Sequence, residues 1–224
     1  MLKRTLLALC LCLPATAGMA ETPRLPWQVR LAEVEATLAE IDAGRLAEAK
    51  AFDKRQGSNY SEILVQAETK AWRRYVDGEC GRRSLSSRQP LPDCRLELTE
   101  ARIEELQDWE FAIGEPCHEA GSTARMEMCH ADRLKVVEAG LAKVEAARRR
   151  DASDTDRDME RMGLEGFAVQ GRAAKASAKA WKAYVAAECA YRVATWTTGT
   201  GASVEEVACP ARLHEQRIRE LGGE

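Results

Sequence analysis

The sequence is poor in aromatic residues. They make up 5% of the 224 residues, which argues against the large aromatic core that many β-sandwiches use. Hydrophobic residues account for 45% and charged residues for 31%, proportions typical of a globular rather than a disordered chain. Alanine, glutamate, arginine and leucine dominate, and all four favour helices. The composition therefore predicts an all-α protein.

The motifs of the common enzyme classes are absent as well. The sequence contains no Gly-x-Ser-x-Gly, no His-Glu-x-x-His, no phosphate-binding loop and no Cys-x-x-Cys. Cys117-His118 and Cys129-His130 together have the ligand types of a zinc site. In an oxidising compartment, however, such cysteines more often bond each other. We therefore expect no enzymatic activity, no metal and no cofactor.

Residues 1–20 have the pattern of a secretory signal peptide. Lys3 and Arg4 precede a short apolar run over residues 6–13, and small residues follow up to Ala17 and Ala20. The run is too short to span a bilayer, and no later segment is apolar enough to do so. Cleavage between Ala17 and Ala20 predicts a periplasmic or secreted protein.

Removal of the signal peptide would leave a mildly acidic chain. The whole sequence has a formal net charge of −3, and residues 1–20 contain two basic and no acidic residues, so the mature chain carries −5. A chain of this charge has no electrostatic reason to bind nucleic acid. It suits a basic protein partner instead.

Two halves of the chain resemble each other. Residues 70–80 align with residues 179–189, and seven of the eleven positions are identical, where chance would give about one. The two copies are offset by 109 residues in this block, by 103 residues in the block before it and by 115 residues in the block after it. The second copy therefore has six extra residues in each of two loops. We predict one repeat over residues 21–112 and another over residues 113–224.

The spacing of apolar residues predicts a helical hairpin followed by a third helix in each copy. In the first copy it indicates helices around residues 31–41 and 63–76, and a third over 96–109. In the second copy we expect a connection at residues 151–154 between the first two helices. The second-copy helices are predicted over residues 122–150, 158–190 and 211–221. The fold class expected is all-α, with two tandem helical-hairpin repeats whose loops are closed by disulfides.

Six cysteines follow the signal peptide, and an even number in an exported chain indicates disulfides. The number alone leaves their connectivity open. Each copy has one cysteine that ends its second helix and one that precedes its third. If the two copies pair alike, Cys80 bonds Cys94, Cys189 bonds Cys209, and the remaining Cys117 and Cys129 bond each other. Proline or glycine within each closed segment would supply the bend that a disulfide requires.

A pattern of cysteine, tryptophan and charged residues recurs in both copies. The second copy carries Cys117, Met126–Cys129, Trp181, Glu188, Cys189, the 199–203 loop, Cys209, Arg217, Glu220 and Leu221. The first copy carries Trp72, Glu79, Cys80, Cys94, Thr99, Arg102, Glu105 and Leu106. This pattern resembles the LprI-type lysozyme inhibitor family of exported bacterial proteins. The second copy is the better match, because the first copy lacks the opening cysteine pair.

The resemblance implies a disulfide-bonded helical hairpin unit and a protein that inhibits lysozyme by binding it. The sequence departs from the family at some positions: Ala39 and Ala142 stand where the family has asparagine. The fold implication depends on the cysteine and tryptophan spacing, which both copies keep in part.

Several of the recurring residues have a structural interpretation. The tryptophans and tyrosines lie on apolar helical faces and are expected to pack in the core. Each recurring glutamate is expected to order the loop after its helix or to pair with one of the recurring arginines. The predicted structural residues are Trp72, Trp181, Tyr75, Tyr184, Glu79, Glu188, Arg102 and Arg217.

Residues 190–206 are the strongest candidate for partner binding. They lie in the segment that a bond between Cys189 and Cys209 would close. Trp196 falls outside any clear helical period and could insert into a partner cleft; alternatively, it folds back onto its own helices. Glu205 and Glu206 could meet basic groups of the partner. The candidate binding residues are Trp196, Thr198, Gly199, Gly201, Glu205 and Glu206.

Two functions fit this sequence. One is an exported, non-catalytic binding protein that inhibits lysozyme or another basic cell-wall hydrolase. The other is a structural or protein-interaction module of the cell envelope, which the amphipathic helices and the duplication support equally. Both require a protein partner, and neither requires nucleic acid or a membrane span.

Overall fold

The described part of the chain consists of helices and the turns between them. A computed structural model describes residues 26–86, 91–107, 117–196 and 201–222. Within these ranges there are six long helices and no strand, which confirms the all-α prediction. The predicted signal peptide lies outside the described residues. The elements are α1 (Pro26–Gln56), α2 (Tyr60–Ser86), α3 (Leu91–Gln107), η2 (His118–Ala120), α4 (Thr123–Arg161), η3 (Glu165–Phe167), α5 (Gln170–Thr195) and α6 (Gly201–Glu220).

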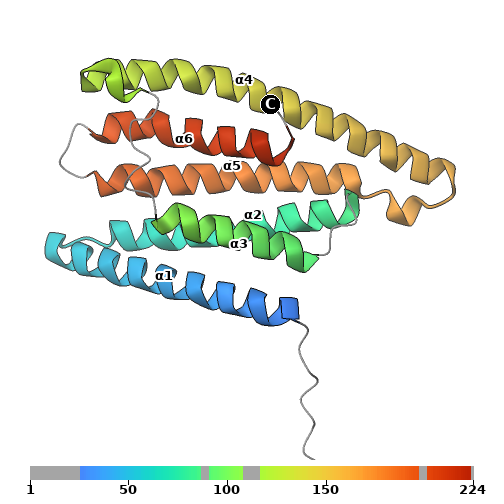
Figure 1. Cartoon of the computed structure of the whole chain (residues 1–224), viewed down its shortest axis with the longest axis horizontal. Coiled ribbons are helices and arrows are strands. Elements are labelled where there is room, and N and C mark those ends of the chain that lie inside the picture. Colours follow the sequence, from blue (N-terminus) through green and yellow to red (C-terminus); the bar gives the residue numbers. More distant parts are fainter. Residues whose placement is uncertain (1–25, 87–90, 108–116, 197–200, 223–224) are drawn as a thin grey trace, which may run out of the picture.

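The helices form two groups that meet where α2 packs against α5. Figure 1 shows α5 in the middle of the bundle, with α6 and then α4 on one side and α2, α3 and α1 on the other. Helices α1, α2 and α3 lie within residues 21–112, and α4, α5 and α6 lie within residues 113–224. The division into two repeats stays a prediction from the sequence.

Each outer helix buries one apolar face. Helix α1 buries Val34 and Leu38, and α4 buries Val137 and Leu141 at the positions 103 residues later. Their four-residue spacing is that of the inward face of an amphipathic helix. Since the other faces are polar, none of the described helices is both long and apolar enough to cross a membrane.

The connection predicted at residues 151–154 is wrong. Helix α4 continues through this segment to Arg161, and α5 begins at Gln170 instead of residue 158. Two ion pairs of the i,i+3 type, Asp154 with Arg157 and Asp158 with Arg161, stabilise the extension. The charges that indicated a loop therefore belong to a solvated helix face, and the chain turns only at Gly163, where φ is 73°.

Helix α6 is also longer than predicted. It begins at Gly201 rather than near residue 211, and Pro210 lies inside it. Proline within a helix is unfavourable because it has no N–H for the helical hydrogen bond. The helix continues on both sides of Pro210 because Val204 and Leu213 are buried on it and Cys209 is bonded to α5. Tertiary contacts here outweigh a local preference.

An aspartate closes the hairpin between α1 and α2. The Asp53 carboxylate accepts the backbone N–H of Ser61 at 3.1 Å and that of Glu62 at 2.8 Å. These amides belong to the start of α2, where helical partners are missing. Although burial raises the pKa of Asp53, the backbone hydrogen bonds and the Ser58 hydroxyl lower it, and the net pKa lies below its ordinary value.

The hairpin between α4 and α5 is closed in the same way. The Asp156 carboxylate accepts the backbone N–H of Gln170 and that of Gly171, both at 2.8 Å. Asp156 lies 14 residues before Gln170, whereas Asp53 lies 8 residues before its first amide partner, Ser61. The six-residue difference in offset between the two copies is therefore located in this connection.

Three disulfides fasten the ends of the helices, in the pairing that the sequence predicted. Cys80 on α2 bonds Cys94 on α3, with Cα atoms 5.5 Å apart. Cys189 on α5 bonds Cys209 on α6, with Cα atoms 5.6 Å apart. The third bond joins Cys117, just before η2, to Cys129 on α4. Each bond closes a short segment of the chain and thereby restricts the unfolded state.

Removal of the bond between α5 and α6 should lower the free energy of unfolding by about 3 kcal/mol, because it frees a closed segment of ~20 residues. The variant is Cys189→Ser with Cys209→Ser, measured by urea denaturation against the wild type under oxidising conditions. An unchanged midpoint with an unchanged m-value would contradict this expectation.

Candidate functional site

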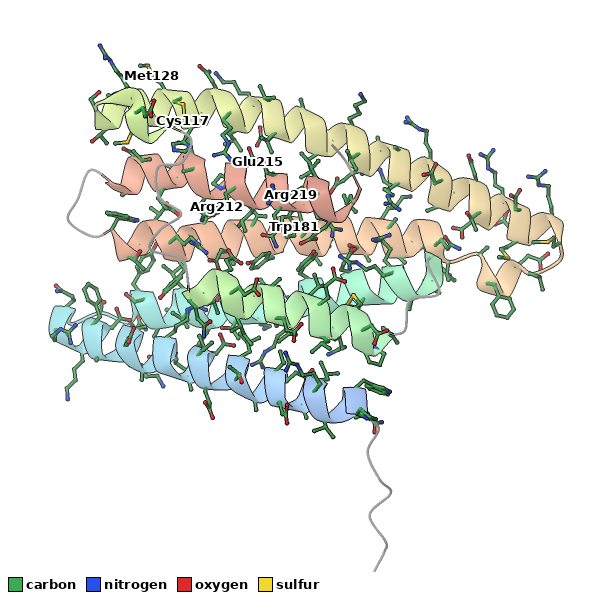
Figure 2. The ribbon with its side chains drawn as sticks, in the orientation of Figure 1. Cys117, Met128, Trp181, Arg212, Glu215 and Arg219 are labelled. Carbon is green, nitrogen blue, oxygen red and sulfur yellow. A yellow bond between two sulfur atoms is a disulfide. The ribbon has the colours of Figure 1, made fainter. Side chains whose placement is uncertain are left out.

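Three aromatic residues meet where α2 crosses α5. The Tyr75 and Tyr184 rings stack with centroids 5.8 Å apart and an interplanar angle of 9°. Trp181 meets Tyr75 edge-on at 4.9 Å and is fully buried at the centre of the bundle (Figure 2). Trp72 is buried in the same core. These side chains join the two groups of helices and are not accessible to a partner.

Buried ion pairs surround this aromatic centre, and two of them join opposite groups of helices. Glu79 on α2 accepts a hydrogen bond from Arg217 on α6 at 2.8 Å. Glu188 on α5 accepts one from Arg102 on α3 at 2.7 Å. All four side chains are at most 3% exposed. Since a buried charge is costly without its partner, neither group of helices is complete without the other.

The two ionic centres differ at the position of Ser177. Near Arg217, the Ser177 hydroxyl donates to Glu79 at 2.6 Å and accepts from Arg217 at 2.9 Å. Near Arg102, the position 109 residues before Ser177 is Glu68, whose carboxylate accepts hydrogen bonds from Arg102 and from Arg45. Two buried carboxylates therefore share the Arg102 guanidinium.

This sharing shifts the titration of the two carboxylates in opposite directions. Burial and the charge of Glu188 raise the pKa of Glu68 to about 7, against the attraction of Arg102 and Arg45. Burial also acts to raise the pKa of Glu188, but Arg102 and Arg192 hold it well below its ordinary value. Glu68 is therefore the member of the pair that takes up a proton first as the pH falls.

Most of the segment predicted for partner binding is helical. Helix α5 continues through Ala190 to Thr195, and α6 begins at Gly201. The expectation of a long disulfide-closed loop over residues 190–206 is therefore wrong. The chain continues its helices because Tyr191, Val193, Val204 and neighbouring residues pack partly or fully against the bundle. Thr198 and Gly199 lie outside the described residues.

Trp196 folds back onto the start of α6. It ends α5, where its backbone N–H donates to the Val193 carbonyl at 3.1 Å. A Cβ atom placed on Gly201 would come within 2.7 Å of the Trp196 ring atom Cδ2, so the indole lies directly against this glycine. The indole is half-buried, and its Nε1 is enclosed. Of the two alternatives for Trp196, the structure shows the one in which it covers its own helices.

The two glutamates that follow have different surroundings. Glu205 is 2% exposed and forms an ion pair with Arg212 at 3.5 Å. Burial raises the pKa of Glu205, and the charge of Arg212 opposes that shift. The expectation that Glu205 faces a partner is therefore wrong, because its helix turns it inward. Glu206, one residue further along α6, is exposed.

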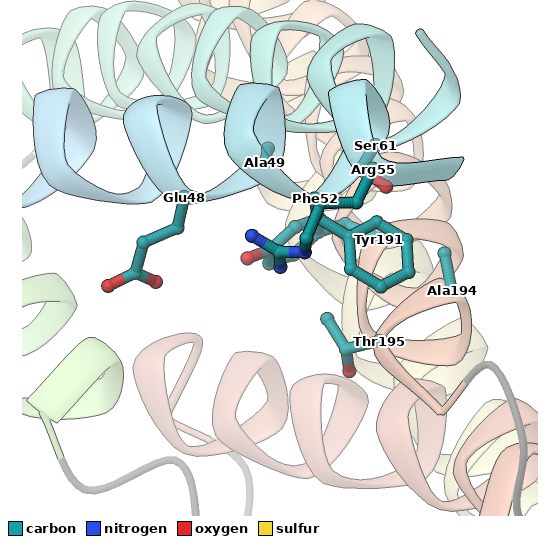
Figure 3. Close-up of a pocket in the computed structure, with 8 residues that line it drawn as sticks. All are labelled: Glu48, Ala49, Phe52, Arg55, Ser61, Tyr191, Ala194 and Thr195. Carbon is teal, nitrogen blue, oxygen red and sulfur yellow. The ribbon is translucent and has the colours of Figure 1, made fainter. Parts of the chain in front are cut away.

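A cavity of about 360 Å³ lies beside the end of α5 (Figure 3). Its lining combines a carboxylate and a guanidinium from α1, Glu48 and Arg55, with the Phe52 ring and with Tyr191 from α5. Arg45 lies 4.7 Å from the centroid of the Tyr191 ring, a distance that allows a cation–π contact. The cavity can accept a side chain or a small polar molecule.

Sequence reasoning did not find this cavity. Glu48, Phe52 and Arg55 have the i,i+4,i+7 spacing of one helix face, and that spacing is the signal in the sequence. It was not interpretable alone, because Tyr191 and Thr195 come from a helix about 140 residues later.

The two histidine side chains that the structure describes, His130 and His214, are buried and half-buried. His130 is buried, and burial together with Arg133 lowers its pKa. Nδ1 of His214 accepts a long hydrogen bond, 3.4 Å, from Trp181. Within the ranges that the structure describes, no three histidine, cysteine, aspartate or glutamate side chains are grouped to hold a metal ion.

The C-terminal half of the chain is similar to a known family. Residues 116–221 match the family model described as lysozyme inhibitor LprI. The matched range contains α4, α5 and α6 and two of the three disulfides, and it agrees with the resemblance of the second copy. No curated protein and no solved structure matches the chain significantly.

Replacement of Arg102 by methionine should cost about 3–5 kcal/mol of unfolding free energy, because Glu68 and Glu188 would be left buried without their shared cation. Urea denaturation at neutral pH measures the loss. The matched control is Arg95→Met, since Arg95 is 40% exposed in its ion pair with Asp77 and should contribute less than about 1 kcal/mol. Equal losses in the two variants would refute the assignment.

Glu68 should make the protein less stable as the pH rises from 4.5 to about 7. The folded chain binds this proton more tightly than the unfolded chain, whose ordinary pKa is 4.5. The resulting stabilisation is complete below the unfolded pKa and is lost as the pH rises through the folded one. Glu68→Gln, which mimics the protonated acid, should remove this decline when unfolding free energies are compared across the range. A variant with the same pH slope as the wild type would exclude Glu68 as its source.

Proposed function

We propose that the chain binds and inhibits a lysozyme or a related basic cell-wall hydrolase, because residues 116–221 match the family model described as lysozyme inhibitor LprI. It acts by occupying a surface of the enzyme and needs no chemistry of its own. The single observation that carries the proposal is that the family match spans one whole group of three helices, from the residue before Cys117 to the residue after α6.

The unit that acts is the whole chain. Arg217 and Glu188 lie inside the matched range, but their partners Glu79 and Arg102 lie outside it. A fragment reduced to the matched range would keep these charges without their partners, at a cost of several kcal/mol. Function must therefore be measured on the intact protein.

The rigidity of the molecule supports binding. The disulfides fix α5 to α6 and the start of α4 to η2, so the surface of the matched half is ordered before it meets a partner. A surface ordered in advance loses less conformational entropy on association. The disulfides also fit an exported protein, since they persist in the oxidising compartments where cell-wall hydrolases act.

The charge of the chain supports a basic target. The formal net charge is −3 for the full sequence, and removal of the predicted signal peptide makes it more negative. Opposite net charges accelerate encounter and add to affinity at low ionic strength. We expect inhibition to weaken as salt is added, because exposed charges are screened within about 10 Å at 0.1 M.

The test is titration of the purified, oxidised mature chain into a lysozyme assay that follows the clearing of a cell-wall suspension. We expect saturable slowing at a stoichiometry of one inhibitor per enzyme, and loss of that effect after reduction and alkylation of the cysteines. Isothermal titration calorimetry on the same samples detects the complex directly. No slowing at micromolar excess, with no heat of binding, would reject the proposal for that enzyme.

A further inference from the structure

The connection between α4 and α5 exposes three large apolar side chains. Met162, Leu164 and Phe167 are 62%, 41% and 69% exposed, and they lie within six consecutive residues. We call these three side chains the apolar tip. Apolar side chains that gather on an otherwise polar surface usually mark a binding site. Figure 1 shows this connection at one end of the bundle, beyond the end of α6.

The backbone of the tip is ordered by its own hydrogen bonds. The Leu164 N–H donates to the Met159 carbonyl at 2.9 Å, and the Phe167 N–H donates to the Leu164 carbonyl at 2.9 Å. Gly163 supplies the left-handed turn, with φ 73°. At the far side, Asp156 holds the start of α5, and a Cβ on Gly171 would lie only 3.0 Å from the Asp156 carboxylate. The exposed side chains therefore stand on a fixed support.

The tip occupies the six additional residues of this hairpin. Asp53 and Asp156 occupy equivalent positions near the ends of α1 and α4. The connection between α1 and α2, however, consists only of residues 57–59. The aspartate cap does not require the six additional residues, since Asp53 closes the shorter α1–α2 hairpin in the same way as Asp156 closes this one. The added residues thus supply exposed apolar surface.

The segment that carries the tip is acidic. Residues 151–170 contain six acidic and two basic side chains, whereas the aligned residues 48–61 contain two acidic and three basic ones. Asp154 and Asp158 are paired with arginines on the same helix. Glu160 and Glu165 are exposed and have no ion pair within the described part of the chain. An apolar projection with free carboxylates around it is complementary to a concave surface with a basic rim.

We propose that the apolar tip is the part of the inhibitor that enters the substrate cleft of a basic cell-wall hydrolase, with Phe167 as the buried anchor and Glu160 and Glu165 against the basic rim. The inference rests on the proposed function and adds the surface that performs it. A projecting segment suits this role because a glycosidase binds its polymer in a long open cleft, and occupation of that cleft excludes substrate.

The other end of α5 is a weaker candidate. Trp196 is turned onto Gly201, and Glu205 is buried. The 26 residues of α5 separate the two ends by roughly 39 Å, so variants at one end do not disturb the other. The exposed Tyr60, at 60%, and the exposed Glu206 therefore provide matched controls far from the tip.

The experiment compares the inhibition constants of the wild type, Phe167→Ser and Tyr60→Ser in the cell-wall clearing assay, with thermal unfolding followed by circular dichroism as the folding control. Phe167→Ser should raise the inhibition constant by about 30-fold or more, the loss typical of a central anchor. Tyr60→Ser, with a side chain of similar size and exposure, should change it less than about twofold. The substrate analogue tri-N-acetylchitotriose should compete with the inhibitor for the enzyme.

A second pair of variants tests the charges and leaves the apolar side chains in place. Glu160→Lys with Glu165→Lys should weaken inhibition about tenfold or more at low salt, and Glu206→Lys should not. The role proposed for the apolar tip is refuted if Phe167→Ser inhibits as well as the wild type, or if Phe167→Ser and Tyr60→Ser weaken inhibition equally. In either case the proposed function stands, because the wild type still inhibits. Absence of competition by the trisaccharide would refute entry into the cleft. If the wild type neither inhibits nor binds, the proposed function fails, and the inference fails with it.

Discussion

The structure depends on two buried arginine–glutamate pairs that join opposite groups of helices. Arg102 of α3 reaches Glu188 of α5, and Arg217 of α6 reaches Glu79 of α2. A charge withdrawn from water is tolerated only beside its partner, so α2 and α5 must pack together before either pair is satisfied. The tyrosines stacked between them then complete a core that contains few aromatic residues. The half that matches the inhibitor family is therefore one part of a larger folding unit.

The connections of the two helical hairpins are held by aspartate caps and not by the buried ion pairs of the core. An aspartate carboxylate takes up the first free amides of the next helix in both hairpins, and this fixes where the helix begins. The residues between the aspartate and those amides are restricted only by backbone hydrogen bonding. Their number and side chains can vary without cost to the core, and here six additional residues give Phe167 its exposed position. If the proposed role of the apolar tip holds, stability and recognition belong to separate parts of the same hairpin.

Much of the fold was predictable because its determinants are local or countable. Apolar spacing identified the faces of Leu38 and Leu141, and the alignment of the two halves limited the cysteine pairing to one choice if the copies pair alike. Helix ends were less predictable. The charged stretch around Asp154 looked like a loop but is helical, and Pro210 lies inside a helix instead of before one. In both cases the helix continues with contacts that one residue's local preference does not show: i,i+3 ion pairs in α4 and a buried face in α6.

The sequence by itself determined the helical class and the positions of the buried apolar faces, because periodicity acts along the chain. It determined the cysteine pairs only on the condition that the two copies pair alike. Only the tertiary structure decided that the recurring glutamates pair across the two halves, that Glu205 is buried and that Phe167 is exposed. Exposure and charge pairing depend on which distant helix lies opposite a side chain. That neighbour is fixed only when α2 and α5 come together.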